Sequence, residues 1–261
     1  MRKVTYTNPV NGLSAEFSSE SALMHLDIKG FDGASAGGRT VVYTPVGLDG
    51  QRLVRANLAA RTITLPVEFT EIADGRYSRQ GALAVWEQLL KVFVPLHEGL
   101  LTWTDGVRSR RIKCRLSETP RLTERLPFLF AASFSLIADY PYWEDCTEQT
   151  VSLASVDTQV DNDCGLSVPF CVDIPSGGSQ PAILSAMVGK GIAFAQPPPQ
   201  NCTVDMRECT VTLADGTNAN NLLTANSEFF MLVPGKNIIR TLDIGTGGAV
   251  LRRRALYMGV D

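Results

Sequence analysis

The segment from Arg61 to Arg115 constrains the fold most, because its hydrophobic pattern changes period twice. Over residues 61–69 apolar side chains alternate with polar ones, which is the period of two of a half-buried strand. The apolar positions on one face are Ile63, Leu65, Val67 and Phe69. Pro66 lies within this run and lacks an N–H group, so we expect an edge strand or a bulge here.

A helical pattern follows the strand. Ser78 is a suitable N-cap and Pro95 cannot continue a helix, so the sequence predicts one amphipathic helix over about residues 78–94. Its apolar positions recur at intervals of three and four residues and are Leu83, Trp86, Leu89, Leu90 and Phe93. We expect Trp86, Leu90 and Phe93 to pack against a sheet.

The chain then returns to strands. Asp105-Gly106 between strand-like runs at 101–103 and 107–115 predicts a tight hairpin turn. Residues 126–137 are apolar at both alternating positions, which predicts a strand buried on both faces in the middle of the first domain. These elements favour a mainly β domain with one helix across its sheet, an α+β arrangement.

With 261 residues, the chain is long enough for two domains. Residues 144–163 are polar without a clear period and are interpreted as a linker, while alternating strands with turn signals follow from Cys164. We therefore expect a first domain over 1–145 and a β-sandwich over 146–261. The four glycines between Gly30 and Gly38 predict a flexible loop that could order on a partner.

The charge and the hydrophobic pattern argue against nucleic-acid binding and against a membrane span. The net charge is −3, so no basic field favours specific nucleic-acid binding. No apolar run approaches the roughly 18 residues of a membrane span, and the first residues lack the pattern of a signal peptide. We expect a soluble product made in a cytoplasm.

No catalytic, cofactor-binding or metal-binding residues are assigned. The six cysteines (Cys114, Cys146, Cys164, Cys171, Cys202 and Cys209) lack the spacing of a zinc site, and we expect them to be unbridged. The two histidines, His25 and His97, lie far in sequence from a plausible nucleophile, and the glycine-rich run at 245–248 lacks the lysine of a phosphate-binding loop. A glycosidase pair such as Glu118 and Glu124 remains open, although no pattern selects it.

Six residues are candidates for a subunit interface. They are Arg108, Arg110, Arg111, Tyr140, Tyr142 and Trp143. Arginines and aromatic residues are enriched at interfaces. The alternatives are a solvated strand that resists edge pairing, for the arginines, and a turn packed on the core, for the aromatic residues around Pro141.

Four segments taken together resemble the distal tail protein (Dit) family of siphophages. The first is Asp49-Gly50 followed by the strand at 61–69, and the second is the helix followed by Gly99-Leu100-Leu101-Thr102, Asp105-Gly106 and Arg111-Ile112. The third is residues 134–143, which end in Tyr-Pro-Tyr-Trp, and the fourth is residues 229–239. Many relatives have Asp before that proline, where this chain has Tyr140. The resemblance covers most of the chain.

The resemblance implies a C-terminal domain that is a galectin-like, jelly-roll β-sandwich. It also implies a homohexameric ring at the end of the tail tube, formed by the N-terminal domains. The implied partners are the tail tube protein, the tail-tip hub and often a receptor-binding protein, in a virion assembled in the bacterial host cytoplasm.

Two alternative functions stay open beside this adaptor role. One is another ring-forming subunit of a tail tube or baseplate. The other is a carbohydrate-binding module, which is less favoured because the chain has no Trp and only Tyr257 among tyrosines after Trp143, and lacks the galectin sugar-binding motif.

Overall fold

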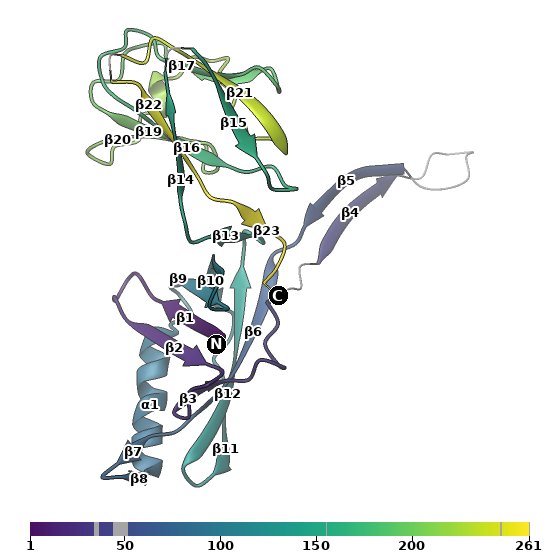
Figure 1. Cartoon of the computed structure of the whole chain (residues 1–261), viewed down its shortest axis with the longest axis vertical. Coiled ribbons are helices and arrows are strands. Elements are labelled where there is room, and N and C mark those ends of the chain that lie inside the picture. Colours follow the sequence, from purple (N-terminus) through teal and green to yellow (C-terminus); the bar gives the residue numbers. More distant parts are fainter. Residues whose placement is uncertain (34–36, 44–51, 155, 246, 261) are drawn as a thin grey trace. The chain divides into compact units, whose positions relative to one another are not determined.

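The computed structural model describes residues 1–33, 37–43, 52–154, 156–245 and 247–260 (Figure 1). The chain divides into two compact units, Met1–Cys146 with Met258–Asp261, and Thr147–Tyr257. The last residues thus belong with the first unit, whereas a linear division at 145/146 assigns them to the second. The fold is mainly β, as predicted from the sequence.

The first unit is built on one large sheet with a single helix. Its elements are β1 Lys3–Thr7, β2 Ser14–Ser18, β3 Met24–Leu26, β4 Gly38–Tyr43, β5 Arg52–Leu58, β6 Arg61–Phe69, β7 Ile72–Ala73, β8 Arg76–Tyr77, α1 Arg79–Val92, β9 Glu98–Thr104, β10 Ser109–Leu116, β11 Leu122–Leu126, β12 Leu129–Ala138 and β13 Trp143–Asp145. The strands pair in the order β11-β12-β6-β3-β2-β1-β9-β10-β13. Because β10 also pairs with β12 at Arg115↔Ile137 and Leu116↔Leu136, the sheet closes on itself like a barrel.

Strand β6 has the predicted alternation but not the predicted position. Its odd-numbered residues are buried, and it lies between β12 and β3 rather than at an edge. Pro66 fits there because the β3 register ends at Leu26↔Val67 and the Pro66 carbonyl accepts from the backbone of Asp27 at 3.2 Å. The carbonyl and the nitrogen of one strand residue point to the same side. The missing N–H therefore faces the end of the short strand β3, and the β12 ladder loses no hydrogen bond.

Helix α1 lies against β2 and β12, and it begins and ends close to the predicted limits (Figure 1). Ser78 is the N-cap, and its hydroxyl accepts from the Gly81 N–H at 3.1 Å. Phe93, just past the helix, is buried and stacks on Tyr6 and Phe134.

The predicted orientation of the helix is partly wrong. Trp86 stacks on Phe69 with centroids 6.0 Å apart, but Leu90 is 37% exposed. Ala82 and Leu89 define the buried face together with Trp86, and Leu90 follows Leu89 by about 100° around the helix axis, which turns it toward solvent.

The hairpin of β9 and β10 is confirmed, with a longer loop than a two-residue turn. The register pairs Thr104 with Ser109, so residues 105–108 form the loop. The Asp105 carboxylate accepts from the N–H groups of Val107 and Arg108 at 2.8 and 2.7 Å, which lowers the pKa of Asp105. Gly106 has φ +94°, a conformation that favours glycine.

Strand β12 is buried on one face only, which corrects the prediction of two buried faces. Phe130, Phe134 and Leu136 point into the core, while Ser133 is exposed on the other face. The outer face is partly shielded from solvent, and its apolar residues Leu129 and Ile137 are half-buried. This explains why apolar residues occur on both faces of the strand.

Strands β4 and β5 form a ribbon of their own. They pair with each other from Gly38↔Leu58 to Tyr43↔Arg52, with a bulge between Val41 and Val42. In the strand order of the described residues, neither joins the large sheet. Part of the predicted Gly30–Gly38 loop, residues 34–36, lies outside the described residues.

The second unit is a β-sandwich. Its elements are β14 Gln149–Leu153, β15 Asp157–Asn162, β16 Phe170–Ile174, β17 Ala182–Ser185, β18 Lys190–Ala193, β19 Cys202–Asp205, β20 Thr210–Leu213, the 3₁₀ turn η1 Asn220–Leu222, β21 Gly235–Leu242 and β22 Ala249–Arg253. The last strand before residue 258, β23 Leu256–Tyr257, belongs to neither sheet of the sandwich. One sheet has the order β14-β22-β16-β19-β20 and the other β15-β21-β17-β18. Side chains from both sheets, such as Val172 and Ile239, share one core.

The predicted linker over 144–163 is wrong, because β14 and β15 occupy most of it. Strand β14 has mostly exposed residues, and β15 buries only Val160 and Asn162. Strands with so few apolar residues show little hydrophobic period, and for that reason the sequence pattern resembled a linker. Among the described helices, none is long and apolar enough to cross a membrane.

Candidate assembly surfaces of the first unit

The arginines of strand β10 have partners within the first unit. Arg111 lies opposite Glu144 of β13, with Nη2 and Oε2 3.3 Å apart and both side chains largely covered. Arg108 contacts Asp105 of the same turn, with Nε and Oδ2 3.3 Å apart, and its side chain is 60% exposed. Arg110 donates from Nη1 to the carbonyl of Gly259. Of the three, Arg108 is therefore the most available to another subunit.

The aromatic candidates are divided between core and surface. Trp143 has no exposed area, and its indole N–H donates to the Gly33 carbonyl at 2.8 Å. Tyr140 and Tyr142 are half-buried, with ring centroids 5.1 Å apart in an edge-on arrangement. Trp143 therefore stabilises the first unit, while the two tyrosine rings are partly accessible to a neighbour.

Arg61, the first residue of β6, is a central side chain that the sequence reasoning missed. It is fully buried, and its guanidinium donates to three backbone carbonyls: Pro141 and Gly33, each at 2.7 Å, and Met258. Burial lowers the pKa of Arg61, and the charge of Asp32 opposes that shift. The sequence pattern does indicate its burial, because Arg61 lies on the same face of the alternating strand as the buried Ile63 and Leu65.

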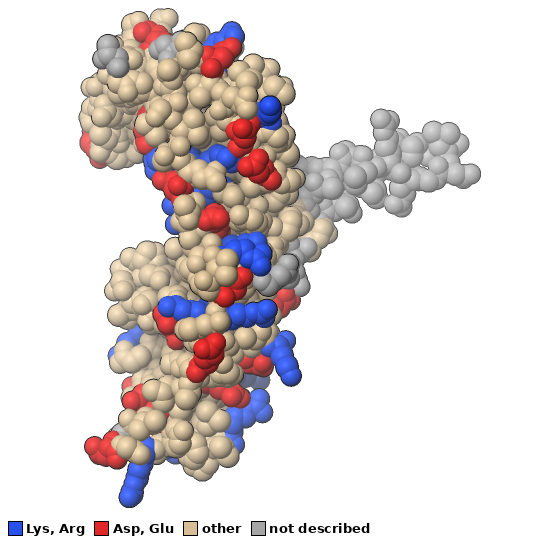
Figure 2. Space-filling model, viewed as in Figure 1, with Lys and Arg blue, Asp and Glu red and all other residues tan. Residues whose placement is uncertain are grey.

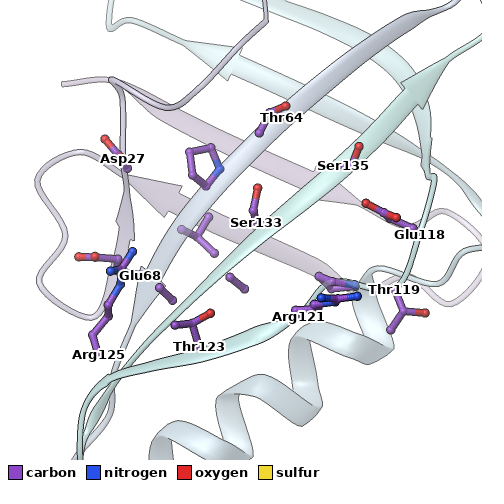
Figure 3. A pocket seen from close by; sticks show the side chains of 15 residues that line it. Asp27, Thr64, Glu68, Glu118, Thr119, Arg121, Thr123, Arg125, Ser133 and Ser135 are labelled. Carbon is purple, nitrogen blue, oxygen red and sulfur yellow. The ribbon is translucent and has the colours of Figure 1, made fainter.

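A groove lies on the outer face of β6 and β12 (Figure 3). Its volume is about 600 Å³. Its floor consists of short side chains in cross-strand pairs, Thr64 opposite Ser135 and Pro66 opposite Ser133. Short side chains let another polypeptide backbone approach a sheet closely, which suits an extended segment or a flat protein surface.

Charged side chains surround this floor. The acidic ones are Asp27, Glu68 and Glu118, and the basic ones are Arg121 and Arg125. Across the visible face of the molecule, Lys and Arg are likewise interspersed with Asp and Glu (Figure 2). Such a mixed rim favours a partner with alternating charges over a polyanion.

The thiols and carboxylates of the described residues do not form a metal-binding group of three or more ligands. All six cysteines are free, and Cys209 is exposed. Burial raises the pKa of Cys202 to about 11 and that of Cys171 to about 12, so both thiols are protonated at neutral pH. A protonated thiol is a weak nucleophile.

Comparisons with known proteins identify the fold. No protein-family model matches the chain, and no curated protein matches it. Among solved structures it resembles the SPP1 Dit (gp 19.1) protein, described as a paradigm of the hub adsorption apparatus in phages that infect Gram-positive bacteria. The TM-score is 0.73 at 14% identity, over 97% of this chain and 99% of that one.

Two structures of the phage P2 baseplate in its activated conformation, with Ca and with Sr, also match. Their TM-scores are 0.59 and 0.58 at 8% and 9% identity, over the full length of both chains. Both units are thus included in each alignment. The chain has a Dit-like fold, as the sequence resemblance predicted.

Proposed function

We propose that this chain is a structural component of a phage tail tip, a distal tail adaptor that forms a homohexameric ring. The observation that carries the proposal is the Dit-like fold over 97% of the chain, with a TM-score of 0.73. In this role the ring joins the tail tube protein to the tail-tip hub and a receptor-binding protein. The chain is then a virion component, assembled in the host cytoplasm, and its role is structural rather than enzymatic.

The isolated β4–β5 ribbon supports assembly through the first unit. A two-stranded ribbon is marginally stable in water by itself. Among the described residues, the strands of this ribbon pair with each other and neither joins the large sheet. Contact with a neighbouring subunit would supply packing for such a ribbon.

The groove on β6 and β12 supports the other half of such a contact. A closed ring needs two different surfaces on each subunit, one meeting the other on the next copy. The ribbon and the groove are two such surfaces within one unit. In this proposal the second unit, with a galectin-like sandwich, is an attachment module for other tail-tip proteins.

Native mass spectrometry and negative-stain electron microscopy of the full chain test the proposal. We expect a species of six times the 28.3 kDa of one chain, and sixfold rings in projection. A monomer at micromolar concentration would contradict it. A ring of another symmetry would favour the alternative, a different ring-forming tube or baseplate subunit.

Labelling of intact virions separates the adaptor from other ring-forming tail proteins. Antibodies to the chain should bind at the junction between tail tube and tip. Binding along the whole tube would instead indicate a tube subunit.

A further inference from the structure

The last described residues of the chain, 258–260, return to the first unit after the second unit is complete. We infer that this return segment (residues 258–260) is the ligand of a backbone-binding site in the first unit, and that its occupancy stabilises that unit. The site consists of Arg61, Arg110 and Gly33. Nothing in the adaptor role requires such a site, and the inference does not depend on assembly.

Two guanidinium groups bind the backbone of the return segment. Arg61 donates from Nη2 to the Met258 carbonyl, and Arg110 donates from Nη1 to the Gly259 carbonyl. Successive carbonyls are thus bound by side chains from two different strands, β6 and β10. Because backbone carbonyls accept both bonds, the side chain of Met258 takes no part in recognition by the arginines.

Arg61 makes the site sensitive to occupancy. The guanidinium has no exposed area, and its other two bonds go to the carbonyls of Gly33 and Pro141. Without Met258, one N–H of this buried cation loses its acceptor, and an unpaired donor on a buried charged group destabilises the fold.

Val260 supplies the side-chain contact. It is 7% exposed and lies directly over Gly33, where an added Cβ would come within 2.6 Å of the Val260 Cγ2 and 3.0 Å of the Phe31 ring. The Gly33 carbonyl is itself fixed by the N–H groups of Arg61 and Trp143. The site therefore selects a branched apolar side chain at 260 and a residue without a Cβ at 33.

The return segment also gives the second unit its second covalent attachment. The chain passes between the units at 146/147 and again at 257/258. The site thus binds the chain just after it re-enters the first unit.

The test uses a chain that stops after Tyr257, with hydrogen exchange measured by mass spectrometry. We expect faster exchange in peptides that cover residues 31–33 and 140–143, and unchanged exchange in strands β16 and β19. The thermal midpoint of the first unit should fall by roughly 5–10 °C. Its unfolding can be followed separately, because Trp86, Trp103 and Trp143, the three tryptophans of the chain, all lie in it.

A peptide of residues 255–261 added to the truncated chain should restore slow exchange. The same peptide with Val260→Asp should not. Equal rescue by both peptides, or wild-type exchange and melting without any peptide, would overturn the inference.

Two full-length variants decide the matter if the truncated chain fails to fold. Val260→Asp and Gly33→Ala should each accelerate exchange around residues 31–33. Val107→Asp, at a side chain 93% exposed, is the matched control and should leave exchange unchanged. Wild-type exchange in both test variants would refute a specific site.

Discussion

At the scale of single residues, the first unit depends on a few side chains that join distant segments. Arg61 holds the backbone at Gly33, Pro141 and Met258, and Trp86 connects the helix to β6 and β12 through Phe69 and Phe134. The first contact is polar and buried, and the second is apolar and half-buried. Substitutions at Arg61 and at Trp86 should therefore lower the free energy of unfolding by different amounts.

Trp86→Ala should lower the free energy of unfolding of the first unit by about 3 kcal/mol, because it removes two ring contacts and leaves a cavity beneath α1. Urea unfolding followed by the fluorescence of Trp103 and Trp143 measures the effect. Leu90→Ala, on the exposed face, should cost less than about 1 kcal/mol. If the two substitutions cost the same, the orientation of the helix is different from the one described.

Acid should destabilise the second unit in part through Asp173. Burial raises the pKa of this carboxyl, but hydrogen bonds from Arg252, with Nε–Oδ2 2.6 Å, and from Thr203 outweigh burial, so the net pKa is lowered. A carboxyl with a lowered folded pKa contributes stability above its unfolded pKa, near 3.9, and loses it as the pH falls through the folded value. This contribution is present at pH 7 and is lost below about pH 4.

Asp173→Asn should therefore reduce the stability of the second unit at pH 7 and flatten its decline below about pH 4. Thermal unfolding followed by circular dichroism across this pH range measures both effects. Asp163→Asn, at an exposed position, is the control and should keep the wild-type profile. A profile of Asp173→Asn parallel to the wild type at every pH would contradict the assignment.

At the scale of elements, the sequence predicted those whose period is strong. The alternation in β6, the N-cap Ser78 and the Asp105-Gly106 hairpin each depend on neighbouring residues, so local sequence suffices to find them. The position of β6 in the middle of the sheet does not follow from its own residues. It depends on the length of β3, whose pairing with β6 ends at Leu26↔Val67, one residue short of Pro66. Neither β3 nor β12 therefore needs the N–H group that Pro66 lacks.

The candidate interface was only partly predictable for the same reason. The arginines of β10 form a visible cluster in the sequence, but their partners, Glu144 and Gly259, come from β13 and from the return segment. A cluster of like charges appears unpaired until distant segments are placed beside it. The burial of Trp143 likewise depends on Gly33, more than a hundred residues earlier.

The ribbon of β4 and β5 can be tested as an assembly element. Replacing residues 39–57 with a short Gly/Ser linker removes the ribbon and leaves the two ends, Gly38 and Leu58, which are paired in the structure. We expect normal tryptophan fluorescence and unfolding of the first unit, because β4 and β5 form a sheet separate from its large sheet in the part of the chain that the structure describes. We also expect loss of the ring, measured by mass photometry.

The control places the same linker in the Asp215-Gly216 turn of the second unit, where Gly216 has φ +85°. That variant should still form rings. Rings of normal mass without the ribbon would show that assembly uses another surface.

At the scale of the whole molecule, the two units have different roles in the proposed function. The first unit holds the isolated ribbon, the groove on β6 and β12, and the site for the return segment. The second unit is a closed sandwich with one shared core. An isolated sandwich with a complete core is expected to be stable as a monomer, whereas the first unit has two surfaces suited to a neighbour.

The division of roles predicts the behaviour of the separate units, provided that each is complete. Residues 1–146 alone lack one of the three carbonyls that accept from Arg61, so the first unit is best made as 1–146 joined by a short Gly/Ser linker to 258–261. We expect this protein to form rings and residues 147–257 to remain monomeric, both measured by light scattering at micromolar concentration.

Within the full chain, Arg121→Glu at the groove should weaken the ring, because it changes the sign of one charge on the rim. Lys236→Glu, an exposed change in the second unit, is the matched control and should not. Arg110 and Arg111 are unsuitable for this test, because both hold other segments of the first unit and their reversal would disturb its folding. A monomeric first unit beside a ring-forming second unit would reverse the roles, and rings that respond equally to both substitutions would remove the groove from the interface.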